Sequence, residues 1–327
     1  MTRHPRLAVR SAAQKRRYAR GTELVEQRLK DVALEPPGRL GAACAATLSS
    51  GGKRVRPLLT LLCARTDREL GESVARAAAA VELLHMATLL HDDVLDDAEL
   101  RRGRPTVAKE FGLDVAVSAG NFLLARAFSE LAGTGDAAAV AALSIAAVGL
   151  SEGEVLQRDQ ARLVTLTRSD YERRCERKTA DLFAVSCRLG AGLSGAGERS
   201  VAALAEYGRL IGLAFQVFDD ILDCSGDEAD TGKRLGADVR DGTITLPLLF
   251  ALEAEPVLGE LLTRDDLDAE EVATVLRTVA QCGALPRARA VAMRYIEDAN
   301  GVLNTCPGPV ERELLAQVAA QVVTRYS

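Results

Sequence analysis

Apolar residues recur at helical spacing along almost the whole chain, and the alternation of a half-buried strand is nearly absent. Turn-forming clusters such as Pro36-Pro37-Gly38, Ser50-Gly51-Gly52 and Pro307-Gly308-Pro309 separate the periodic segments. Ala and Leu dominate, Trp is absent and aromatic residues make up only 4% of the chain, which favours helix over strand. The sequence therefore predicts an all-α fold.

The periodic segments predict helices over residues 21–33, 38–49, 55–66, 72–96, 113–132, 136–160, 168–191, 198–223, 246–262, 268–281, 284–304 and 308–325. No Pro- or Ser-rich linker divides them, so residues 21–327 are expected to form a single domain. Residues 1–20 hold seven Lys and Arg residues with no apolar segment after them. They are expected to be a flexible basic tail, with a weak role at a membrane surface as the alternative.

The bulk composition excludes several classes of function. The net charge of −5 argues against a nucleic-acid binder. The seven Cys residues are scattered without a CxxC pair, which predicts reduced thiols, mostly in the core, and a cytoplasmic protein. The longest apolar run, residues 137–150, is shorter than the roughly 20 residues that span a bilayer. We expect no transmembrane segment and interpret this run as a buried core helix.

Two aspartate clusters of the same form stand far apart in the chain. Asp92, Asp93 and Asp96 follow the apolar run of LLHDDVLDD, and Asp219, Asp220 and Asp223 follow that of FQVFDDILD. Residues i and i+4 share a helix face, so the first and last aspartates of each cluster lie together. Carboxylates at the ends of apolar helices are costly to bury unless a cation neutralises them. The clusters predict two facing Mg²⁺ sites that hold a polyphosphate.

Cationic segments accompany the clusters. Arg101 and Arg102 follow the first cluster, where a planar guanidinium suits a phosphate, although a solvated basic loop is the alternative. Upstream, Gly51-Gly52-Lys53-Arg54-Val55-Arg56-Pro57 combines paired glycines with three cations, and its spacing is not that of a P-loop. Lys178 stands directly before the apolar run 180–185, where it could reach a phosphate or simply be a charge on the helix surface. Lys233 follows the second cluster in a loop that presents cations.

One diphosphate held by metal and one held by cations, around an apolar helical cavity, predict a particular reaction. The metal-held diphosphate is the leaving group of an allylic substrate, whose developing charge Mg²⁺, Arg and Lys stabilise. The second diphosphate belongs to a substrate whose double bond is the nucleophile, and the apolar cavity excludes water.

The chain resembles the trans-isoprenyl diphosphate synthases, the polyprenyl synthetase family. The matching segments, in order from about residue 50 to 250, are GGKRVRP (51–57), HMATLLHDDVLDDAELRRGRPT (85–106), ERKTADLF (176–183), GLAFQVFDDILD (212–223) and GKRLGADVRDGTITLP (232–247). The resemblance implies an isoprenoid synthase helical bundle around a central cavity, a homodimer, and about three Mg²⁺ ions per active site. Its substrates would be isopentenyl diphosphate and an allylic prenyl diphosphate.

The resemblance also implies a role for each matching residue. Asp92, Asp96 and Asp219 would coordinate Mg²⁺, with Asp93, Asp220 and Asp223 in support. Arg101, Lys178, Thr179, Gln216 and Lys233 would hold the allylic diphosphate. Lys53, Arg56, His85 and Arg102 would hold isopentenyl diphosphate. His91 is expected to be structural and Gln157 to be a polar cavity residue.

Two positions depart from the family pattern. Asn121 stands where the family usually has aspartate, and Thr243 stands where it usually has lysine. The second change removes a possible cation from the phosphate site, which is worth about 1–3 kcal/mol for a charge-assisted bond.

The helix before the first cluster is expected to form one wall of the cavity in which the product grows. Ala87 and Thr88, five and four residues before Asp92, are small, and Leu84 lies one turn further back. On the facing helix, Phe128 is the candidate floor of the cavity, with ordinary core packing as the alternative. We expect a product of medium or long chain, C30 or longer, with geranylgeranyl or farnesyl diphosphate as the short-chain alternative.

Two other functions fit the same fold. A terpene synthase would cyclise a prenyl diphosphate without isopentenyl diphosphate, and it would not need Lys53, Arg56 and Arg102 together. A regulatory subunit of a heteromeric synthase would tend to lose aspartates, whereas both clusters are intact here.

Overall fold

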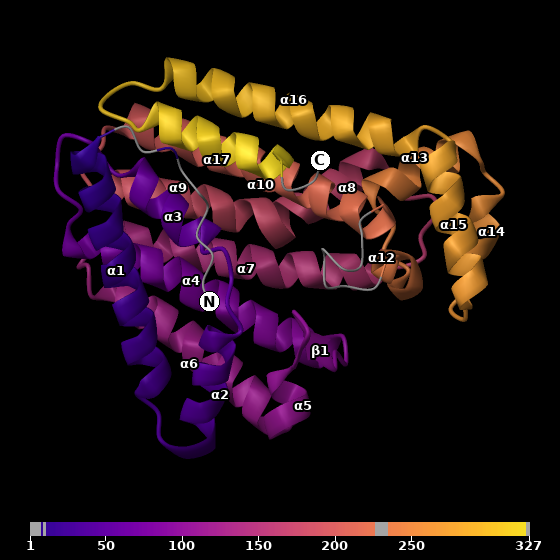
Figure 1. Cartoon of the computed structure of the whole chain (residues 1–327), viewed down its shortest axis with the longest axis horizontal. Coiled ribbons are helices and arrows are strands. Elements are labelled where there is room, and N and C mark those ends of the chain that lie inside the picture. Colours follow the sequence, from indigo (N-terminus) through magenta and orange to yellow (C-terminus); the bar gives the residue numbers. More distant parts are fainter. Residues whose placement is uncertain (1–7, 9–10, 226–234, 325–327) are drawn as a thin grey trace. The chain divides into compact units, whose positions relative to one another are not determined.

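The computed structural model describes residue 8, residues 11–225 and residues 235–324, which are helical almost throughout (Figure 1). The helices are α1 (Ala12–Leu34), α2 (Gly38–Ser49), α3 (Val55–Cys63), α4 (Glu72–Leu95), α5 (Val107–Phe111), α6 (Leu113–Ala132), α7 (Ala137–Asp159), α8 (Arg168–Cys175), the π-helix η1 (Glu176–Ala180), α9 (Asp181–Leu193), α10 (Glu198–Ser225), α12 (Ala237–Asp241), α13 (Leu246–Ala254), α14 (Leu258–Leu262), α15 (Ala269–Gln281), α16 (Ala284–Thr305) and α17 (Arg312–Thr324). Two short strands, β1 (Leu100–Arg101) and β2 (Arg104–Pro105), pair antiparallel. The all-α prediction is confirmed.

The chain divides into two compact units. The first unit comprises Met1–Ala147, Leu182–Gly208 and Val302–Val318, and the second comprises Val148–Asp181, Arg209–Gly301 and Ala319–Ser327. Each unit carries one aspartate cluster. The division falls within the segment expected to form a single domain, 21–327, which stays a prediction.

Helix α1 begins earlier than its predicted start at residue 21. Ser11 caps it by accepting a hydrogen bond from the amide of Gln14 at 3.1 Å. Tyr18 is buried, and the guanidinium of Arg17 donates to the carbonyls of Arg65, at 2.6 Å, and Arg68. Residues 12–20 of the expected basic tail are therefore an ordered helix that packs on the first unit.

Helix α4 is the central helix of the first unit. It packs against α6, α3 and α1, and most of its side chains up to Leu90 are buried on every side. A helix that is apolar all round must be surrounded, and the row of alanines Ala77–Ala80 lets its neighbours pack closely. The core of the first unit thus holds the helix that ends in the first aspartate cluster.

The second unit is built from helices that the periodicity predicted, with two interruptions. The predicted helix 168–191 contains the π-turn η1, and the predicted helix 246–262 breaks into α13 and α14 at Pro256. Proline cannot donate a helical hydrogen bond and disfavours helix at the residue before it. In the second unit α12 was not predicted, and in the first unit neither the β1–β2 hairpin nor α5 was predicted. Elements of two to five residues carry no periodic signal.

Helix α7 corrects one expectation. By length and composition three helices could cross a membrane, namely α4, α7 and α10, and the structure buries 72% and 56% of the apolar windows of α4 and α10. For α7 the buried share is only 28%, and Ile145, Val148 and Val155 are among its exposed side chains. The prediction of a buried core helix over residues 137–150 is wrong, since periodicity does not reveal whether a partner element covers an apolar helix.

Candidate active site

The first aspartate cluster ends α4 on an open face of that helix. Asp92 and Asp96 lie one turn apart, and the half-buried His85 and Thr88 precede them at spacings of three and four residues. Asp96 is exposed and forms the C-cap of the helix, where its amide donates to the carbonyl of Asp92 at 2.9 Å. The two residues therefore lie one helical turn apart at the end of α4, at the i, i+4 spacing seen in the sequence.

Asp93 points elsewhere and has a different partner. Its side chain is buried and accepts a hydrogen bond from Nε of Arg101 at 2.7 Å. Burial raises the pKa of Asp93, and the nearby Arg101 opposes that rise. This ion pair positions Arg101 beside the helix end, while a guanidinium has further N–H groups with which it can bind a phosphate.

The GGKRVRP segment contains one cation that is structural. Arg54 is buried, adopts a left-handed φ of 51°, and donates to Glu82 at 2.7 Å and to Glu26 at 3.1 Å. It therefore anchors the segment between α1 and α4 and does not face a ligand. Of the three cations in the segment, only the exposed Lys53 and the half-buried Arg56 can face a ligand.

Arg56 has the features of a phosphate-binding group. Its guanidinium carbon lies 4.7 Å from the ring centroid of Phe183. Burial lowers the pKa of Arg56 to about 10, with Glu82 acting in the opposite direction. Its Nε atom is buried and has no hydrogen-bond partner among the described residues. A buried donor without a partner is costly, so an anion here would be favoured.

The hairpin after the first cluster meets the glycine pair of the same segment. Arg102, at the hairpin turn with φ of 53°, donates from Nη1 to the carbonyl of Gly51. A Cβ atom at Gly52, whose φ is 156°, would lie 3.2 Å from the same nitrogen. The paired glycines thus permit close contact with Arg102, which joins the two cationic segments through residues that lie 51 positions apart in the sequence.

The pKa of His85 reflects its burial and the positive charge of the arginines around it. Burial, followed by the charges of Arg56, Arg102, Arg101 and Arg54, holds the pKa of His85 well below its usual range. The imidazole is therefore neutral at pH 7 and able to donate or accept without adding charge. Three of the residues predicted to hold isopentenyl diphosphate, Arg56, His85 and Arg102, thus form one cationic region in the first unit.

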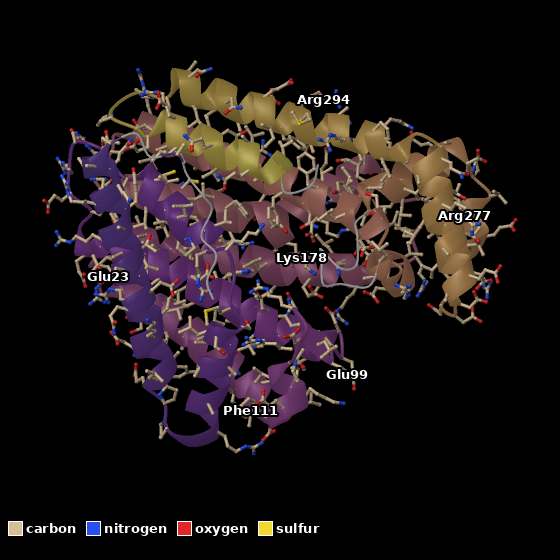
Figure 2. The ribbon with its side chains drawn as sticks, in the orientation of Figure 1. Glu23, Glu99, Phe111, Lys178, Arg277 and Arg294 are labelled. Carbon is tan, nitrogen blue, oxygen red and sulfur yellow. The ribbon has the colours of Figure 1, made fainter. Side chains whose placement is uncertain are left out.

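In the second unit, Lys178 lies on the π-turn η1. Figure 2 labels its position. Its Nζ donates to Glu154 at 2.7 Å and to Gln157 at 3.0 Å. A Cβ atom at Gly153 would lie 2.6 Å from the backbone nitrogen of Lys178, so only glycine allows α7 to pack this closely. Single π-turns are frequent at functional sites. The sequence missed Glu154, although its spacing of three residues from Gln157 places both on one helix face.

A hydrogen-bonded chain joins the π-turn to the second cluster. Thr179 donates to Gln216 at 2.7 Å, and Gln216 donates to Asp220 at 2.8 Å. Tyr171 donates to the other oxygen of Asp220 at 2.6 Å. Burial, with a smaller contribution from the negative charge of Asp219, raises the pKa of Asp220 to about 6, although the hydrogen bonds from Tyr171 and Gln216 act in the opposite direction. Both carboxylate oxygens of Asp220 therefore have partners. The sequence missed Tyr171, whose only signal is its position two helical turns before Lys178.

The carboxylate of Asp223 has backbone partners. Its two carboxylate oxygens accept hydrogen bonds from the amides of Ala237 and Asp238, each at 3.0 Å. Asp219 is half-buried on α10. Lys233, predicted to hold the allylic diphosphate, lies outside the described residues.

The remaining predicted residues vary in burial. Leu84 and Ala87 are each 1% exposed, whereas Thr88 is half-buried and donates to the carbonyl of His85 at 2.9 Å. Phe128 is half-buried on α6. Helix geometry places Thr88 on the face of Asp92 and turns Ala87 away from it. Thr88 is therefore the better placed of the two to limit an open cavity.

Three further residues named in the sequence analysis, Asn121, Thr243 and His91, have simple surroundings in the structure. Asn121 is exposed on α6, and Thr243 is buried with its amide bonded to the carbonyl of Asp238 at 2.8 Å. A Cβ atom at Gly120 would lie 2.3 Å from Nε2 of His91, so that ring packs directly on α6. This contact agrees with a structural role for His91.

The aspartate oxygens of each unit suit a Mg²⁺ ion whose other ligands are water and the phosphate oxygens of a substrate. Among the described residues, no group of three His, Cys, Asp or Glu side chains forms a ready-made metal site. Mg²⁺ keeps several waters and usually binds through one or two carboxylates plus phosphate oxygens. The pair Asp92 and Asp96 supplies hard oxygen ligands of this kind, and so does Asp219.

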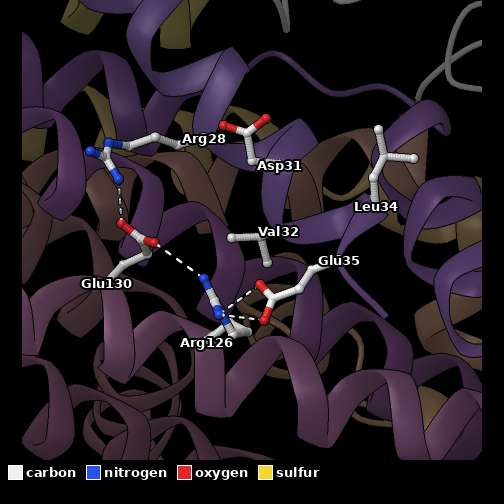
Figure 3. Close-up of a pocket in the computed structure, with 7 residues that line it drawn as sticks. All are labelled: Arg28, Asp31, Val32, Leu34, Glu35, Arg126 and Glu130. Atoms are coloured by element: carbon white, nitrogen blue, oxygen red, sulfur yellow. Dashed lines mark hydrogen bonds and ion pairs between the residues drawn. The ribbon is translucent and has the colours of Figure 1, made fainter. Parts of the chain in front are cut away.

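One cleft in the first unit holds none of the predicted residues. It has a volume of about 380 Å³ and is lined by Arg28, Asp31, Val32, Leu34, Glu35, Arg126 and Glu130 (Figure 3). The buried Glu130 accepts from Arg28 at 2.9 Å and from Arg126 at 3.5 Å, and Arg126 also pairs with Glu35 at 2.7 Å. These charges compensate one another within the fold.

Comparisons with known proteins by family model, by sequence and by structure agree with one another. A family model described as polyprenyl synthetase matches residues 38–279. The chain is 39% identical over 303 residues to the heptaprenyl diphosphate synthase component 2 of Geobacillus stearothermophilus, covering 92% of this chain and 94% of that protein. It is 35% identical over 297 residues to the geranylgeranyl diphosphate synthase of Methanosarcina mazei, covering 88% and 90%. The structure of a polyprenyl synthase from Caulobacter crescentus, complexed with calcium and isoprenyl diphosphate, aligns with a TM-score of 0.85 at 32% identity and covers 96% of each chain.

Proposed function

The chain belongs to the polyprenyl synthetase family, and on that premise we propose that it joins isopentenyl diphosphate to an allylic prenyl diphosphate. The reaction breaks the C–O bond of the allylic diphosphate, forms one C–C bond, and releases diphosphate and a proton. The product is a medium- or long-chain polyprenyl diphosphate, in keeping with the heptaprenyl product named for the Geobacillus relative. The geranylgeranyl synthase among the relatives makes a shorter product the second candidate.

The observation that carries this proposal is the cationic region around His85. Arg56, Arg101 and Arg102 all lower the pKa of His85, and the buried Nε of Arg56 has no hydrogen-bond partner among the described residues. A terpene synthase needs to bind only the diphosphate that leaves. A second anion site built from arginines, glycines and a neutral imidazole therefore favours condensation of two diphosphates over cyclisation of one.

The proposed roles are those that the family resemblance implies, and two hydrogen bonds in the structure indicate how Asp93 and Asp220 would act. Asp92, Asp96 and Asp219 would coordinate Mg²⁺, while Asp93 and Asp220, whose carboxylates accept hydrogen bonds from Arg101 and Gln216, would act through those residues. Bound Mg²⁺ would supply Lewis-acid stabilisation of the leaving diphosphate. The allylic diphosphate is held by Arg101, Lys178, Thr179, Gln216 and Lys233, and isopentenyl diphosphate by Lys53, Arg56, His85 and Arg102.

Lys178 is held before any substrate arrives. Glu154 and Gln157 fix its ammonium group, so the cation does not need to be ordered when diphosphate binds. Glu154 also offsets the lysine charge in the absence of substrate. Diphosphate, with its larger negative charge, competes for the same ammonium as the site fills.

The test is turnover by the purified single chain. The chain is incubated with Mg²⁺, isopentenyl diphosphate and C5, C10, C15 or C20 allylic primers, and the products are measured by mass spectrometry. We expect a ladder ending at C30 or longer, with no product when isopentenyl diphosphate is omitted. Cyclised products without isopentenyl diphosphate would identify a terpene synthase, and an inactive single chain would point to a regulatory subunit. Chelation of the metal should abolish turnover.

A homodimer is the proposed assembly, and the exposed face of α7 supports it. Ile145, Val148 and Val155 are 67%, 56% and 57% exposed, and spacings of three and seven residues place them on one stripe. Light scattering should give the mass of two chains, and Val148→Asp should reduce it to one. The name of the Geobacillus relative, component 2, makes a different second subunit the alternative. A monomeric wild-type chain in solution would count against the homodimer.

A further inference from the structure

Asp223 has a place in the second unit that metal ligation does not explain. Both carboxylate oxygens accept backbone amides, from Ala237 and Asp238, at 3.0 Å each. Its own carbonyl accepts from the amide of Gly236 at 2.9 Å. One residue near the end of α10 is thus tied by three hydrogen bonds to three consecutive residues at the start of α12.

These bonds satisfy groups that both helix ends leave unpaired. The last carbonyls of a helix lack intrahelical partners, and so do the first amides of the next helix. The Asp223 carbonyl belongs to the last turn of α10, and the amides belong to the first residues of α12. A carboxylate also suits the positive end of a helix. Helix α12 is only five residues long and depends on such contacts, because short helices are marginal in isolation.

The backbone at the junction is built for this contact. Gly236 has a left-handed φ of 70°, and a Cβ atom there would lie 2.8 Å from Cγ1 of Val272 on α15. No other residue could easily place its amide against the Asp223 carbonyl while α12 packs on α15. Val239, in the middle of α12, is fully buried, so the segment is part of the core of the second unit.

A second anchor holds the far end of the same segment. The amide of Arg162 donates to the carbonyl of Gly242 at 2.7 Å, and its Nη2 donates to the carbonyl of Arg240 at 3.0 Å. Arg162 itself adopts a left-handed φ of 59°, which a non-glycine residue accepts only when its surroundings impose it. The segment 236–242 is therefore fixed at its start by Asp223 and at its end by Arg162.

From this arrangement we propose that Asp223 is a positioning residue, which anchors α12 to α10 and does not coordinate Mg²⁺. The inference rests on the proposed function, in which Asp219 coordinates Mg²⁺. It divides the second cluster into three roles. Asp219 binds metal, Asp220 orders Gln216 and Tyr171, and Asp223 joins two helices.

The test compares Asp223→Asn and Asp223→Ala with Asp219→Asn, and uses Asp241→Asn at the other end of α12 as the control. Hydrogen exchange of the amides at 236–238 is measured first, in metal-free protein. Loss of one helix cap corresponds to about tenfold easier opening. We expect at least tenfold faster exchange in Asp223→Ala, a smaller change in Asp223→Asn, which keeps one acceptor oxygen, and none in Asp219→Asn or Asp241→Asn.

Binding of inorganic diphosphate with Mg²⁺, followed by titration calorimetry, gives the second measurement. Asp219→Asn should raise the half-saturating Mg²⁺ concentration by tenfold or more, whereas both Asp223 variants should stay within about twofold of the wild type. A shift in Asp223→Asn as large as that in Asp219→Asn would make Asp223 a metal ligand and overturn the proposal. Unchanged exchange at 236–238 in Asp223→Ala would overturn it as well. Failure of the proposed function would appear differently, as a wild-type chain that makes no product while the exchange pattern holds.

Discussion

Replacement of Gly153 by alanine tests the claim that close packing of α7 on the π-turn positions Lys178. The added Cβ would lie 2.6 Å from the backbone nitrogen of Lys178, 2.9 Å from its Cα and 3.0 Å from its Cβ. These neighbours belong to the backbone and to the root of a side chain, so no flexible group can move aside. Either α7 or η1 must shift.

The expected magnitude combines two opposing effects. Alanine in place of glycine inside a helix stabilises by about 1 kcal/mol. Overpacking of a tight interior contact costs about 1–3 kcal/mol. Gly153→Ala should therefore be destabilised by about 0–2 kcal/mol. The matched control is Gly301→Ala on α16, where the added Cβ meets nothing within 4 Å and only the favourable effect remains. The two variants should differ by about 1–3 kcal/mol.

Activity gives the second measurement for the same variant. A displacement of Lys178 by about 1 Å would disturb its bonds to Glu154 and Gln157, and misplacement on that scale can reduce a rate by on the order of 10²-fold. Urea unfolding followed by circular dichroism measures the stability, and steady-state turnover with varied allylic diphosphate measures KM and kcat. The reasoning is refuted if Gly153→Ala gains as much stability as Gly301→Ala and turns over like the wild type.

Three further predictions concern the first unit. Because the pKa of His85 is depressed in the folded protein, the unfolded chain binds more protons than the folded chain below pH 6.5. The free energy of unfolding of the wild type should therefore fall relative to that of His85→Gln as the pH falls. Urea titrations should show a difference of up to about 1.4 kcal/mol per pH unit. Arg54→Ala should cost about 3–5 kcal/mol by leaving Glu82 buried and unpaired, whereas Lys53→Ala should stay within about 0.5 kcal/mol and raise KM for isopentenyl diphosphate. Thr88→Phe should shorten the product and Phe128→Ala should lengthen it, and an unchanged product ladder for both would contradict the cavity model.

Much of the local structure could be predicted because helical periodicity belongs to short stretches of chain. The predicted segments 38–49, 72–96 and 113–132 agree with α2, α4 and α6 to within a residue. The same local logic placed Asp92 and Asp96 on one helix face. It also identified Lys178 as a candidate cation, because a charge directly before an apolar run stands out in the sequence.

Other parts of the site were beyond local reasoning. Glu154 and Tyr171 bind Lys178 and Asp220, yet in the sequence they are marked only by their helical spacing from Gln157 and Lys178, which does not reveal these contacts. The exposure of α7 was misjudged for the same reason, since an apolar helix looks alike in sequence whether its own chain covers it or not. Contacts of this kind join residues that lie tens of positions apart.

The sequence by itself determined the helical class, the two carboxylate clusters and the cationic segments, because spacing and residue type are local properties. Only the tertiary structure decided which of these charges face a ligand. Arg54 and Arg56 look alike in GGKRVRP, but Glu26 and Glu82, each 28 residues away, neutralise the first and leave the second for an anion. Asp219 and Asp223 look alike in DDILD, but two amides from α12 occupy the oxygens of the second. Whether a charged side chain is paired within the protein depends on residues that folding brings next to it. The spacing of residues within a motif does not identify those partners.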